Sequence, residues 1–337
     1  MSEQLQRIRQ LQESLKEKML RYLESPQNFA TAVEGFHLVR REDGGAPEQC
    51  FEKPLVGLVV QGAKHSVMAG QEFVYTENQT VVAGVDMPIA SYVINPTHEK
   101  PFLFAYVYLD KKTLSSLALE MKDALPQSDE ESVGVSVADA DVDVMEMFLR
   151  LVELMEKPEQ IPVRAPMMLR ELHYLLLISP HGPLLRRLNT PGTQNHQVMQ
   201  AISWIRENYK NPLKVELLAR QVNMSASNLH RHFKLLTGLS PLQYQKQLRL
   251  YEAQRLMLVE HERASRAALS VGYESVTQFN REYKRVFGEP PLRDMNRRRT
   301  MSGLTKARPR SSCRTPQVPM PRARRADDKS LDDRRRS

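Results

Sequence analysis

The sequence predicts an α+β protein in which a β-rich half precedes an all-helical half. Between residues 34 and 110, short β-rich runs are separated by Gly, Pro and Asn. After residue 196 the apolar residues recur every three or four positions, which is the spacing of amphipathic helices. A 17-residue stretch of this second half also occurs twice. Because 337 residues exceed what one hydrophobic core usually organises, we expect two domains plus extra segments.

The repeated stretch predicts one structural unit that is used twice. The first copy reads SASNLHRHFKLLTGLSP from Ser225, and the second reads SVTQFNREYKRVFGEPP from Ser275. In each copy a serine is suited to cap a helix, and a glycine and a proline mark its end. Short apolar-faced segments precede the copies, at residues 215–222 and 264–271. A single pair of this kind is more often an ordinary αα-hairpin, but two copies with the same Arg and Lys favour two helix-turn-helix units.

Residues from about 197 to 294 resemble the DNA-binding domain of AraC/XylS-type bacterial transcription regulators. The most specific part is VGYESVTQFNREYKRVFGEPP, at residues 271–291. The resemblance implies two helix-turn-helix units in one monomer, joined by a long helix at residues 242–258. Residues 54–75, PLVGLVVQGAKHSVMAGQEFVY, are similar to the cupin-related sensor domain of one AraC-type subgroup. The β-rich runs by themselves indicate an antiparallel barrel or sandwich, and the resemblance implies a cupin-like antiparallel β-barrel with flanking helices.

Four segments are expected along the chain. They are a cupin-like sensor and dimerisation domain at residues 1–180, a linker at 181–195, an AraC-type double helix-turn-helix domain at 196–298, and a disordered basic tail at 299–337. The linker is rich in Pro, Gly and polar residues, and Pro, Ser and Arg dominate the tail. The basic residues of the tail either attract phosphates without regard to sequence or are simply solvated.

Charge separates the two halves. Residues 1–194 carry a net charge of −8, residues 195–299 carry +9 and residues 300–337 carry +7. Such asymmetry is expected when only one half of a protein meets a polyanion.

Four helical segments flank the β-rich region. The first, residues 3–24, either packs on its own domain or contributes to dimerisation. The others are residues 111–125, the run VDVMEMFLRLVELMEK capped by Asp139 or Asp141, and residues 166–179. The apolar faces of these last three segments are wider than a helix needs to pack on a small barrel. In relatives, helices at these places form the dimer interface, so we favour dimerisation over self-packing.

Outward-facing residues near the start of a recognition helix contact bases, and residues at its ends contact phosphates. We expect Leu229, Phe233, Phe279 and Tyr283 to face inward. The outward positions match those that relatives use to bind DNA: Ser227, His230, Arg231, Lys234, Val276, Thr277, Asn280, Arg281 and Lys284. Arg suits guanine, Asn suits adenine, and Val suits the thymine methyl group. Arg231 and Arg281 either contact bases or serve as structural or phosphate-binding arginines.

The β-rich region offers an interior for one small ligand. Candidate effector-binding residues, chosen because they lie in predicted strands, are Val59, Gln61, Tyr92 and Tyr106. A cupin metalloenzyme needs clustered metal ligands, and His37, His65 and His98 do not form a His-x-His pair. We therefore expect no catalytic residue, metal or cofactor.

The expected function is sequence-specific transcription regulation by a homodimer that binds double-stranded promoter or operator DNA and a small-molecule effector. An activator would also contact RNA polymerase. The alternatives are a DNA-binding protein whose first half is only a dimerisation scaffold, and a metalloenzyme with a DNA-binding appendage. Two distant cysteines, Cys50 and Cys313, and a polar N-terminus without a long apolar run favour a cytoplasmic protein with no membrane partner.

Overall fold

The computed structural model describes residues 3–45, 47–121 and 133–304, and only the backbone of residues 299–304. Residues up to Met295 form one compact unit, and the segment from Asn296 belongs to a second. The predicted disordered tail at residues 299–337 is wrong at its start, because residues 299–304 are helical. Residues 305–337, with Cys313, lie outside the described residues. Within the described part, no helix has the length and apolar character needed to cross a membrane.

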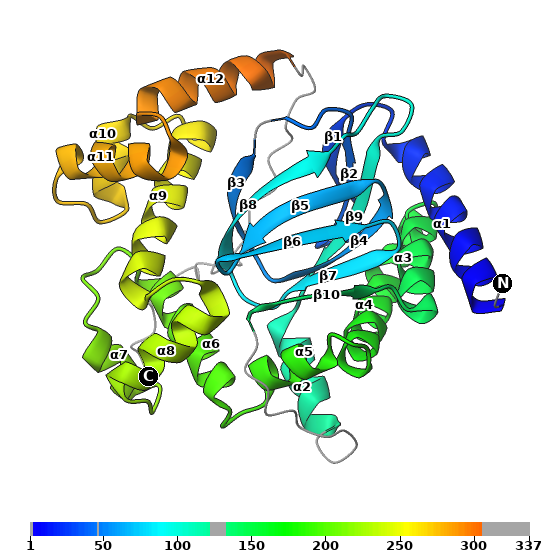
Figure 1. Cartoon of the computed structure of the whole chain (residues 1–337), viewed down its shortest axis with the longest axis horizontal. Coiled ribbons are helices and arrows are strands. Elements are labelled where there is room, and N and C mark those ends of the chain that lie inside the picture. The colour runs from blue at the N-terminus through cyan, green and yellow to red at the C-terminus, as the bar shows by residue number, and fades with distance from the viewer. Residues whose placement is uncertain (1–2, 46, 122–132, 305–337) are drawn as a thin grey trace, which may run out of the picture. The chain divides into compact units, whose positions relative to one another are not determined.

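The first half contains ten strands in the described residues, and all of their pairings are antiparallel (Figure 1). A six-stranded sheet has the order β1-β2-β9-β4-β7-β10, and a four-stranded sheet has the order β3-β8-β5-β6. The strands are β1 (Gln27–Ala30), β2 (Phe36–Arg41), β3 (Glu48–Glu52), β4 (Leu55–Gln61), β5 (Ala63–Met68), β6 (Gln71–Thr76), β7 (Gln79–Ala83), β8 (Met87–Ile94), β9 (Phe102–Tyr108) and β10 (Val135–Asp139).

The two sheets do not close into the predicted barrel. Among the described strands, β1, β10, β3 and β6 each have one hydrogen-bonded neighbour, so each sheet ends in two edge strands. The predicted antiparallel β architecture is confirmed. The predicted closed barrel is wrong, because the strands form two open sheets. The central strand β4 is buried at every position, which explains its unbroken apolar run LVGLVV. The predicted hairpin turn at residues 68–72 joins β5 to β6, with Ala69 and Gly70 both at positive φ.

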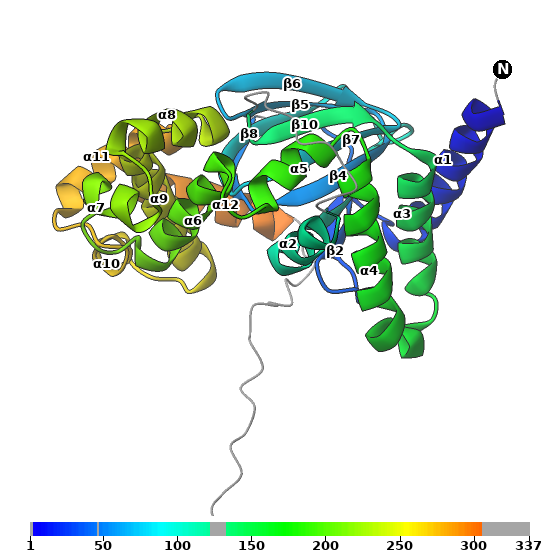
Figure 2. The same cartoon turned by 90° about the horizontal axis from the view of Figure 1, so that it is seen from below.

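Helices pack beside the sheets (Figure 2). They are α1 (Glu3–Tyr22), α2 (Lys111–Glu120), α3 (Val142–Leu154), the short 3-10 helix η1 (Pro158–Gln160) and α4 (Ile161–Ile178). Asp141 caps α3 by accepting a hydrogen bond from the Asp143 amide. Helix α1 buries Leu11, Leu15 and Met19 and packs on α3, so its apolar face is used within its own domain.

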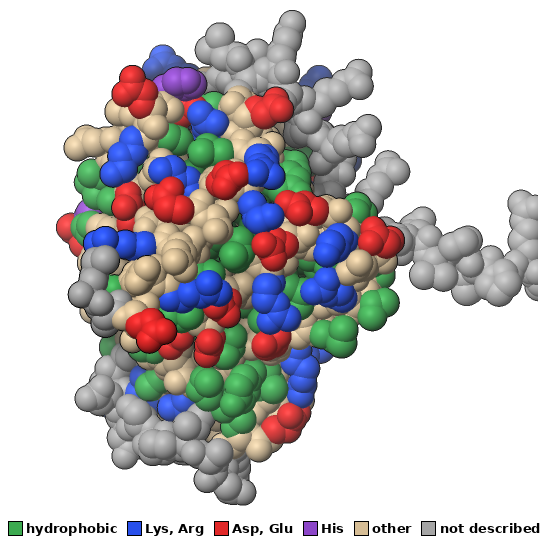
Figure 3. Space-filling model, turned by 90° about the vertical axis from the view of Figure 1, so that its right-hand side faces the viewer, with side chains coloured by type: hydrophobic (Ala, Val, Ile, Leu, Met, Phe, Trp, Pro, Cys, Tyr) green, Lys and Arg blue, Asp and Glu red, His purple; other side chains and the backbone are tan. Residues whose placement is uncertain are grey.

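Ion pairs fasten α1 to α3 at the surface. Arg7 pairs with Glu146 at 2.6 Å, and Lys18 pairs with Glu153 at 3.7 Å. Lys18 also pairs at 3.0 Å with Glu156, which follows the end of α3. The face on which α1 lies carries basic and acidic side chains in mixture (Figure 3). A surface of alternating charge of this kind is ordinary for a solvated face and is poorly suited to hold a polyanion.

Part of the predicted linker is helical. Helix α5 (Gly182–Asn189) buries Leu184, Leu185 and Leu188, and α6 (Gln194–Asn208) follows after a short turn. The buried His181 precedes α5, and its ring bonds to Thr80 of β7 and Ser136 of β10. Residues 181–189 are thus attached to the sheet rather than spanning solvent.

The second half is all helical in the described residues. After α6 come α7 (Val215–Gln221), α8 (Ala226–Thr237), α9 (Pro241–Val259), α10 (Ala264–Ser270), α11 (Val276–Phe287) and α12 (Pro291–Leu304). The predicted joining helix is confirmed as α9, which begins in a capping box between Ser240 and Gln243. Helix α12 runs past residue 298, where the predicted domain ends.

Two hydrophobic cores organise these helices. The larger core includes the β-sheets and continues into α6, α7 and α8, up to Tyr244 of α9. The smaller core begins at Leu250 of α9 and includes α10 and α11. Helix α9 therefore belongs to both cores and connects them.

Candidate nucleic-acid interface and sensor cavity

The two repeats form matching helices. Helices α8 and α11 are each twelve residues long and begin fifty residues apart. Ser225 and Ser275 cap them by accepting hydrogen bonds from the amides of Asn228 and Gln278. Gly238 and Gly288 end them in the left-handed conformation, which glycine adopts without a steric penalty. The repeat and its helix-turn-helix interpretation are confirmed at the level of structure.

A left-handed residue sets the sharp turn inside each unit. In the first unit it is Asn223, with φ 57°, and in the second it is Gly272, with φ 91°. A Cβ atom at Gly272 would lie 2.2 Å from the carbonyl oxygen of Lys210, so only glycine fits there. At Asn223 a side chain is tolerated, because asparagine often adopts this conformation.

The recognition helices separate into inward and outward faces as predicted. Leu229, Phe233, Phe279 and Tyr283 are all fully buried. Eight of the candidate DNA-binding residues are exposed, and Val276 is partly exposed; the eight are Ser227, His230, Arg231, Lys234, Thr277, Asn280, Arg281 and Lys284. Their accessibility makes both helices available for contact with DNA. The individual base contacts stay predictions.

Equivalent arginines in the two units have different surroundings. Arg231 lies along α8, with Nη2 at 3.2 Å from Asn228 Oδ1 and 3.0 Å from His232 Nε2. Arg281 makes no ion pair with any described residue. The side chain of Arg281 is therefore more available for a base or a phosphate than that of Arg231.

Large rings fill the space around the small alanines of the second unit. Ala267 and Ala268 of α10 are fully buried in the core that contains Tyr273, Phe279 and Tyr283. The Tyr273 and Phe279 rings lie 5.4 Å apart in an edge-on arrangement. Glu282 anchors the same region by accepting from Tyr273 Oη at 2.9 Å and pairing with Lys246 of α9 at 3.0 Å. The second unit is thus tightly packed.

Arg249 of α9 is an important residue that sequence reasoning missed. Its guanidinium donates to the carbonyl oxygens of Tyr209, Lys210 and Asn211, which follow α6. Its Nη1 also donates to the Gly272 carbonyl at 2.9 Å, in the turn of the second unit. One side chain thereby fixes the loop after the first helix and the turn before α11. No local pattern marks such a role, because all four acceptors are backbone atoms distant in sequence.

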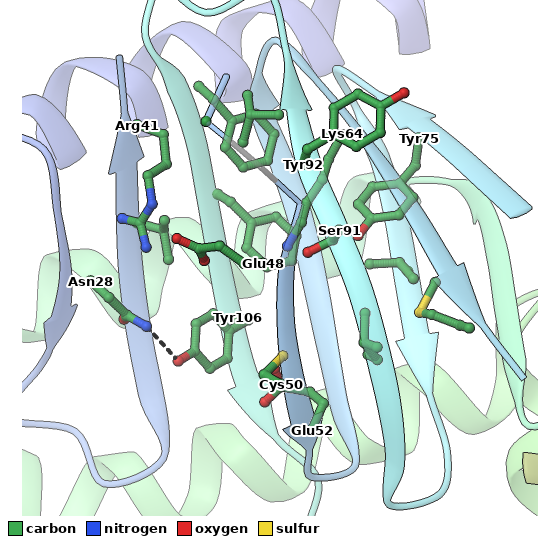
Figure 4. A pocket seen from close by; sticks show the side chains of 18 of the residues that line it. Asn28, Arg41, Glu48, Cys50, Glu52, Lys64, Tyr75, Ser91, Tyr92 and Tyr106 are labelled. Atoms are coloured by element: carbon green, nitrogen blue, oxygen red, sulfur yellow. Dashed lines mark hydrogen bonds between the residues drawn. The ribbon is translucent and has the colours of Figure 1, made fainter. Parts of the chain in front are cut away.

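A cavity of about 270 Å³ lies between the two sheets (Figure 4). Apolar side chains such as Phe102, Phe104 and Val93 line one part of it. Its charged and polar lining includes Arg41, Asp43, Glu48, Glu52, Lys64 and Ser91. An apolar pocket with a few placed polar groups is the usual form of a small-molecule site.

The predicted effector residues fall into two groups. Tyr92 and Tyr106 line the cavity, and Asn28 donates to Tyr106 Oη at 3.2 Å. Val59 and Gln61 are buried elsewhere on β4, where Gln61 donates to the Pro101 carbonyl at 2.7 Å. The cavity residues of β3 were missed because its short sequence, EQCFE, has no clear strand pattern.

Burial disfavours the charged forms of several polar groups of the cavity. It raises the pKa of the Cys50 thiol to about 12, and it also raises the pKa values of Glu52 and Tyr106. Cys50 and Glu52 lie side by side at one end of the cavity, with Sγ 3.6 Å from Oε2 (Figure 4). A thiol with so high a pKa is a poor nucleophile.

The three histidines of the β-rich half are dispersed. His37 stacks on Tyr106 at 4.7 Å, His65 stacks on Tyr92 at 4.9 Å, and His98 bonds to Glu42 at 3.0 Å. Among the described residues, no group of three or more His, Cys, Asp or Glu side chains is placed to hold a metal ion.

Two helix-turn-helix units joined by one helix follow a β-domain with an internal cavity. This arrangement is typical of DNA-binding proteins that have two domains. Residues 32–184 match the family of AraC-type transcriptional regulator N-termini, and residues 218–297 match a helix-turn-helix domain family. The chain belongs to the AraC-type transcriptional regulators.

Individual relatives agree with this family. The chain is 32% identical over 117 residues to the transcriptional regulator ArgR of Pseudomonas aeruginosa, which is 35% of each chain. It is 30% identical over 103 residues to the transcriptional activator RhaS of Escherichia fergusonii, which is 31% of this chain and 36% of the relative. The chain spans about a third of the length of these curated relatives.

Two solved structures share the fold. Apo ToxT from Vibrio cholerae superimposes with a TM-score of 0.53 at 12% identity, covering 79% of this chain and 98% of ToxT. ToxT bound to an unsaturated fatty acid superimposes with a TM-score of 0.50 at 12% identity, covering 77% and 93%. At this identity the likeness concerns the fold alone.

Proposed function

We propose that this protein is a sequence-specific, DNA-binding transcription regulator in which α8 and α11 read successive major-groove segments of double-stranded DNA. The observation that carries the proposal is the pair of identically bounded helices with matching exposed residues. The net charge of +9 over residues 195–299 supports it, because phosphate contacts supply much of the affinity for DNA. A regulator that acts on the bacterial chromosome works in the cytoplasm. If it activates, as RhaS does by name, it also contacts RNA polymerase.

The cavity between the sheets is the proposed effector site. It is large enough for a small organic molecule, and it joins an apolar lining to the cations of Arg41 and Lys64. The ligand-bound form of ToxT, which shares the fold, supports a sensor role for the first half. The competing proposal is an effector-independent protein whose first half only dimerises.

An exposed apolar stripe on α4 is the proposed dimer interface. Val163, Met167, Tyr174 and Ile178 are 68%, 60%, 42% and 47% exposed. Their spacing of four, seven and four residues places them on one face of the helix. Contiguous exposed apolar side chains are uncommon on a monomer and mark interaction surfaces.

Site selection from random duplex DNA with the whole chain tests the proposed function. We expect a selected motif with two short blocks about one helical turn apart, roughly 34 Å. No enriched motif would contradict sequence-specific binding. A single block would mean that only one unit reads bases.

A thermal-shift panel of small metabolites tests the sensor role. A ligand of the cavity should raise the melting temperature, because it binds the folded state only. If the ligand is an anion, the double variant Arg41→Gln and Lys64→Gln should lose the shift, whereas Lys16→Gln on α1 should keep it. No response to any compound would favour the scaffold proposal.

A further inference from the structure

Strand β3 has two differently used faces. Successive side chains of a strand point to opposite sides, so Phe51 projects away from the cavity that Cys50 and Glu52 line. On its own side, Phe51 contacts two rings of α9. Its ring centroid lies 5.2 Å from that of Tyr244 and 5.6 Å from that of Tyr251.

Each of these tyrosines contacts a recognition helix. Tyr244 lies 5.3 Å from Phe233 of α8, with the rings at 84°. Tyr251 lies 5.0 Å from Phe287 of α11, with the rings at 83°. Edge-on contacts at these distances are the favourable geometry for aromatic pairs. Five rings therefore form a continuous row from α8 to α11, and the middle ring comes from the β-domain.

The spacing on α9 explains how one residue contacts both halves. Tyr244 and Tyr251 are seven residues apart, which is about two turns, so they lie on the same face of the helix. Tyr244 is part of the larger hydrophobic core. Tyr251 lies next to Leu250, the first residue of α9 in the smaller core. Phe51 thus bridges the part of α9 that connects the two units.

We propose that Phe51 is a positioning residue for DNA reading, which fixes the spacing and orientation of α8 relative to α11 through Tyr244 and Tyr251. The inference rests on the proposed function, because it assumes that both helices read bases. By this proposal, the β-domain takes a direct part in selecting the operator. The ring of Phe51, outside the helix-turn-helix domain, partly sets the preferred distance between the two blocks of the DNA site.

Site selection with whole-chain variants tests this role. Phe51→Leu removes the ring but keeps an apolar side chain, and Phe51→Tyr keeps the ring and is the conservative rescue. Phe73→Leu is the matched control, because Phe73 packs against the same core from β6 and has no ring contact with α9 among the described residues. Melting temperatures establish that all variants are folded. If Phe51→Leu does not fold, Tyr251→Leu removes the same contact from the α9 side.

We expect Phe51→Leu to select both blocks with a broadened distribution of spacings. Its preference for the wild-type spacing over a spacing one base pair longer should fall about tenfold, which corresponds to about 1.4 kcal/mol. Its affinity for either block alone should not change, and Phe51→Tyr and Phe73→Leu should keep the wild-type spacing. The proposal is overturned if Phe51→Leu keeps the wild-type spacing, or if Phe73→Leu broadens it equally. A wild-type protein that selects no motif contradicts the proposed function instead, so the two failures are distinguishable.

Discussion

Arg231 and Arg281 occupy equivalent positions in the repeat, yet their contacts predict different roles. Arg231 is held along its helix by Asn228 and His232, whereas Arg281 has no ion pair in the described part of the chain. Bidentate contact with the O6 and N7 atoms of guanine needs a guanidinium that is not engaged by its own helix, so we expect Arg281 to contact a base and Arg231 to contact phosphate.

We therefore expect Arg281→Ala to cost about 1–3 kcal/mol of binding free energy and to relax specificity at one base position. Arg231→Ala should weaken binding about equally on all sequences and reduce its salt dependence. Binding measured on a set of single-base operator variants, at two salt concentrations, checks both. Equal loss of specificity in the two variants would show that the contacts of Arg231 do not decide its role.

His181 joins the start of α5 to two strands, and its ring is buried. Burial disfavours the charged imidazolium and lowers its pKa to about 4. Because the unfolded chain binds the proton near pH 6.5 and the folded chain does not, stability from this group is complete above about pH 6.5 and is lost as pH falls toward 4.

At about 1.4 kcal/mol per pKa unit, the loss amounts to about 3 kcal/mol at pH 4. We expect His181→Asn, measured by urea unfolding between pH 7.5 and 4.5, to be less stable at neutral pH but to lose less stability on acidification than the wild type. Parallel pH profiles would rule out this origin of acid sensitivity.

At the level of elements, α9 holds the two units together through backbone acceptors. Replacing Arg249 by Met keeps the aliphatic stem but removes a charged donor from four carbonyl oxygens, including that of Gly272. The carbonyls of Tyr209 and Asn211 still accept from Gln245. We expect Arg249→Met to reduce the free energy of unfolding by about 2 kcal/mol, since hydrogen bonds from charged groups exceed neutral ones. Denaturant unfolding measures the change.

The matched control is Arg266→Met, whose guanidinium is exposed and, among the described residues, forms an ion pair only with Glu262, just before α10. Its expected effect is below about 0.5 kcal/mol. Equal effects from both variants would mean that Arg249 contributes no more than a surface charge.

The elements were predicted from sequence wherever local chemistry decides them. The caps Ser225 and Ser275 and the left-handed Gly238 and Gly288 define α8 and α11 within their own residues. Sheet closure, in contrast, depends on pairings between distant strands, and the predicted barrel is an open pair of sheets. The missed strand β3 and the missed helix α5 are short, and tertiary packing rather than periodicity stabilises them.

In the candidate sites, too, the features set by local sequence were predicted and those set by distant contacts were not. The outward positions of α8 and α11 followed from helical periodicity and the resemblance, and the structure leaves them accessible. The cavity depended on which strand faces are brought together, so Tyr92 and Tyr106 were identified but Arg41 and Lys64 were not. Alternation alone gives two faces of a strand and does not say which face meets the other sheet.

At the scale of the whole molecule, two copies of the chain are expected to associate through α4. We predict that Met167→Glu raises the dissociation constant of the dimer at least about tenfold, because it places a charge within an apolar interface. Sedimentation over a range of protein concentrations measures the constant. Val259→Glu is the matched control, since Val259 is similarly exposed, at 59%, but lies on α9. A wild-type chain that stays monomeric, or equal effects of both variants, would exclude this interface.

The most direct test of the account compares sites selected by the whole chain with those selected by His230→Ala and Asn280→Ala. Because these exposed residues lie on different recognition helices, each variant should relax the sequence of one block and leave the other unchanged. If both variants select the wild-type motif, or if both weaken binding uniformly without changing it, α8 and α11 do not read bases as two separate units and the central claim is wrong.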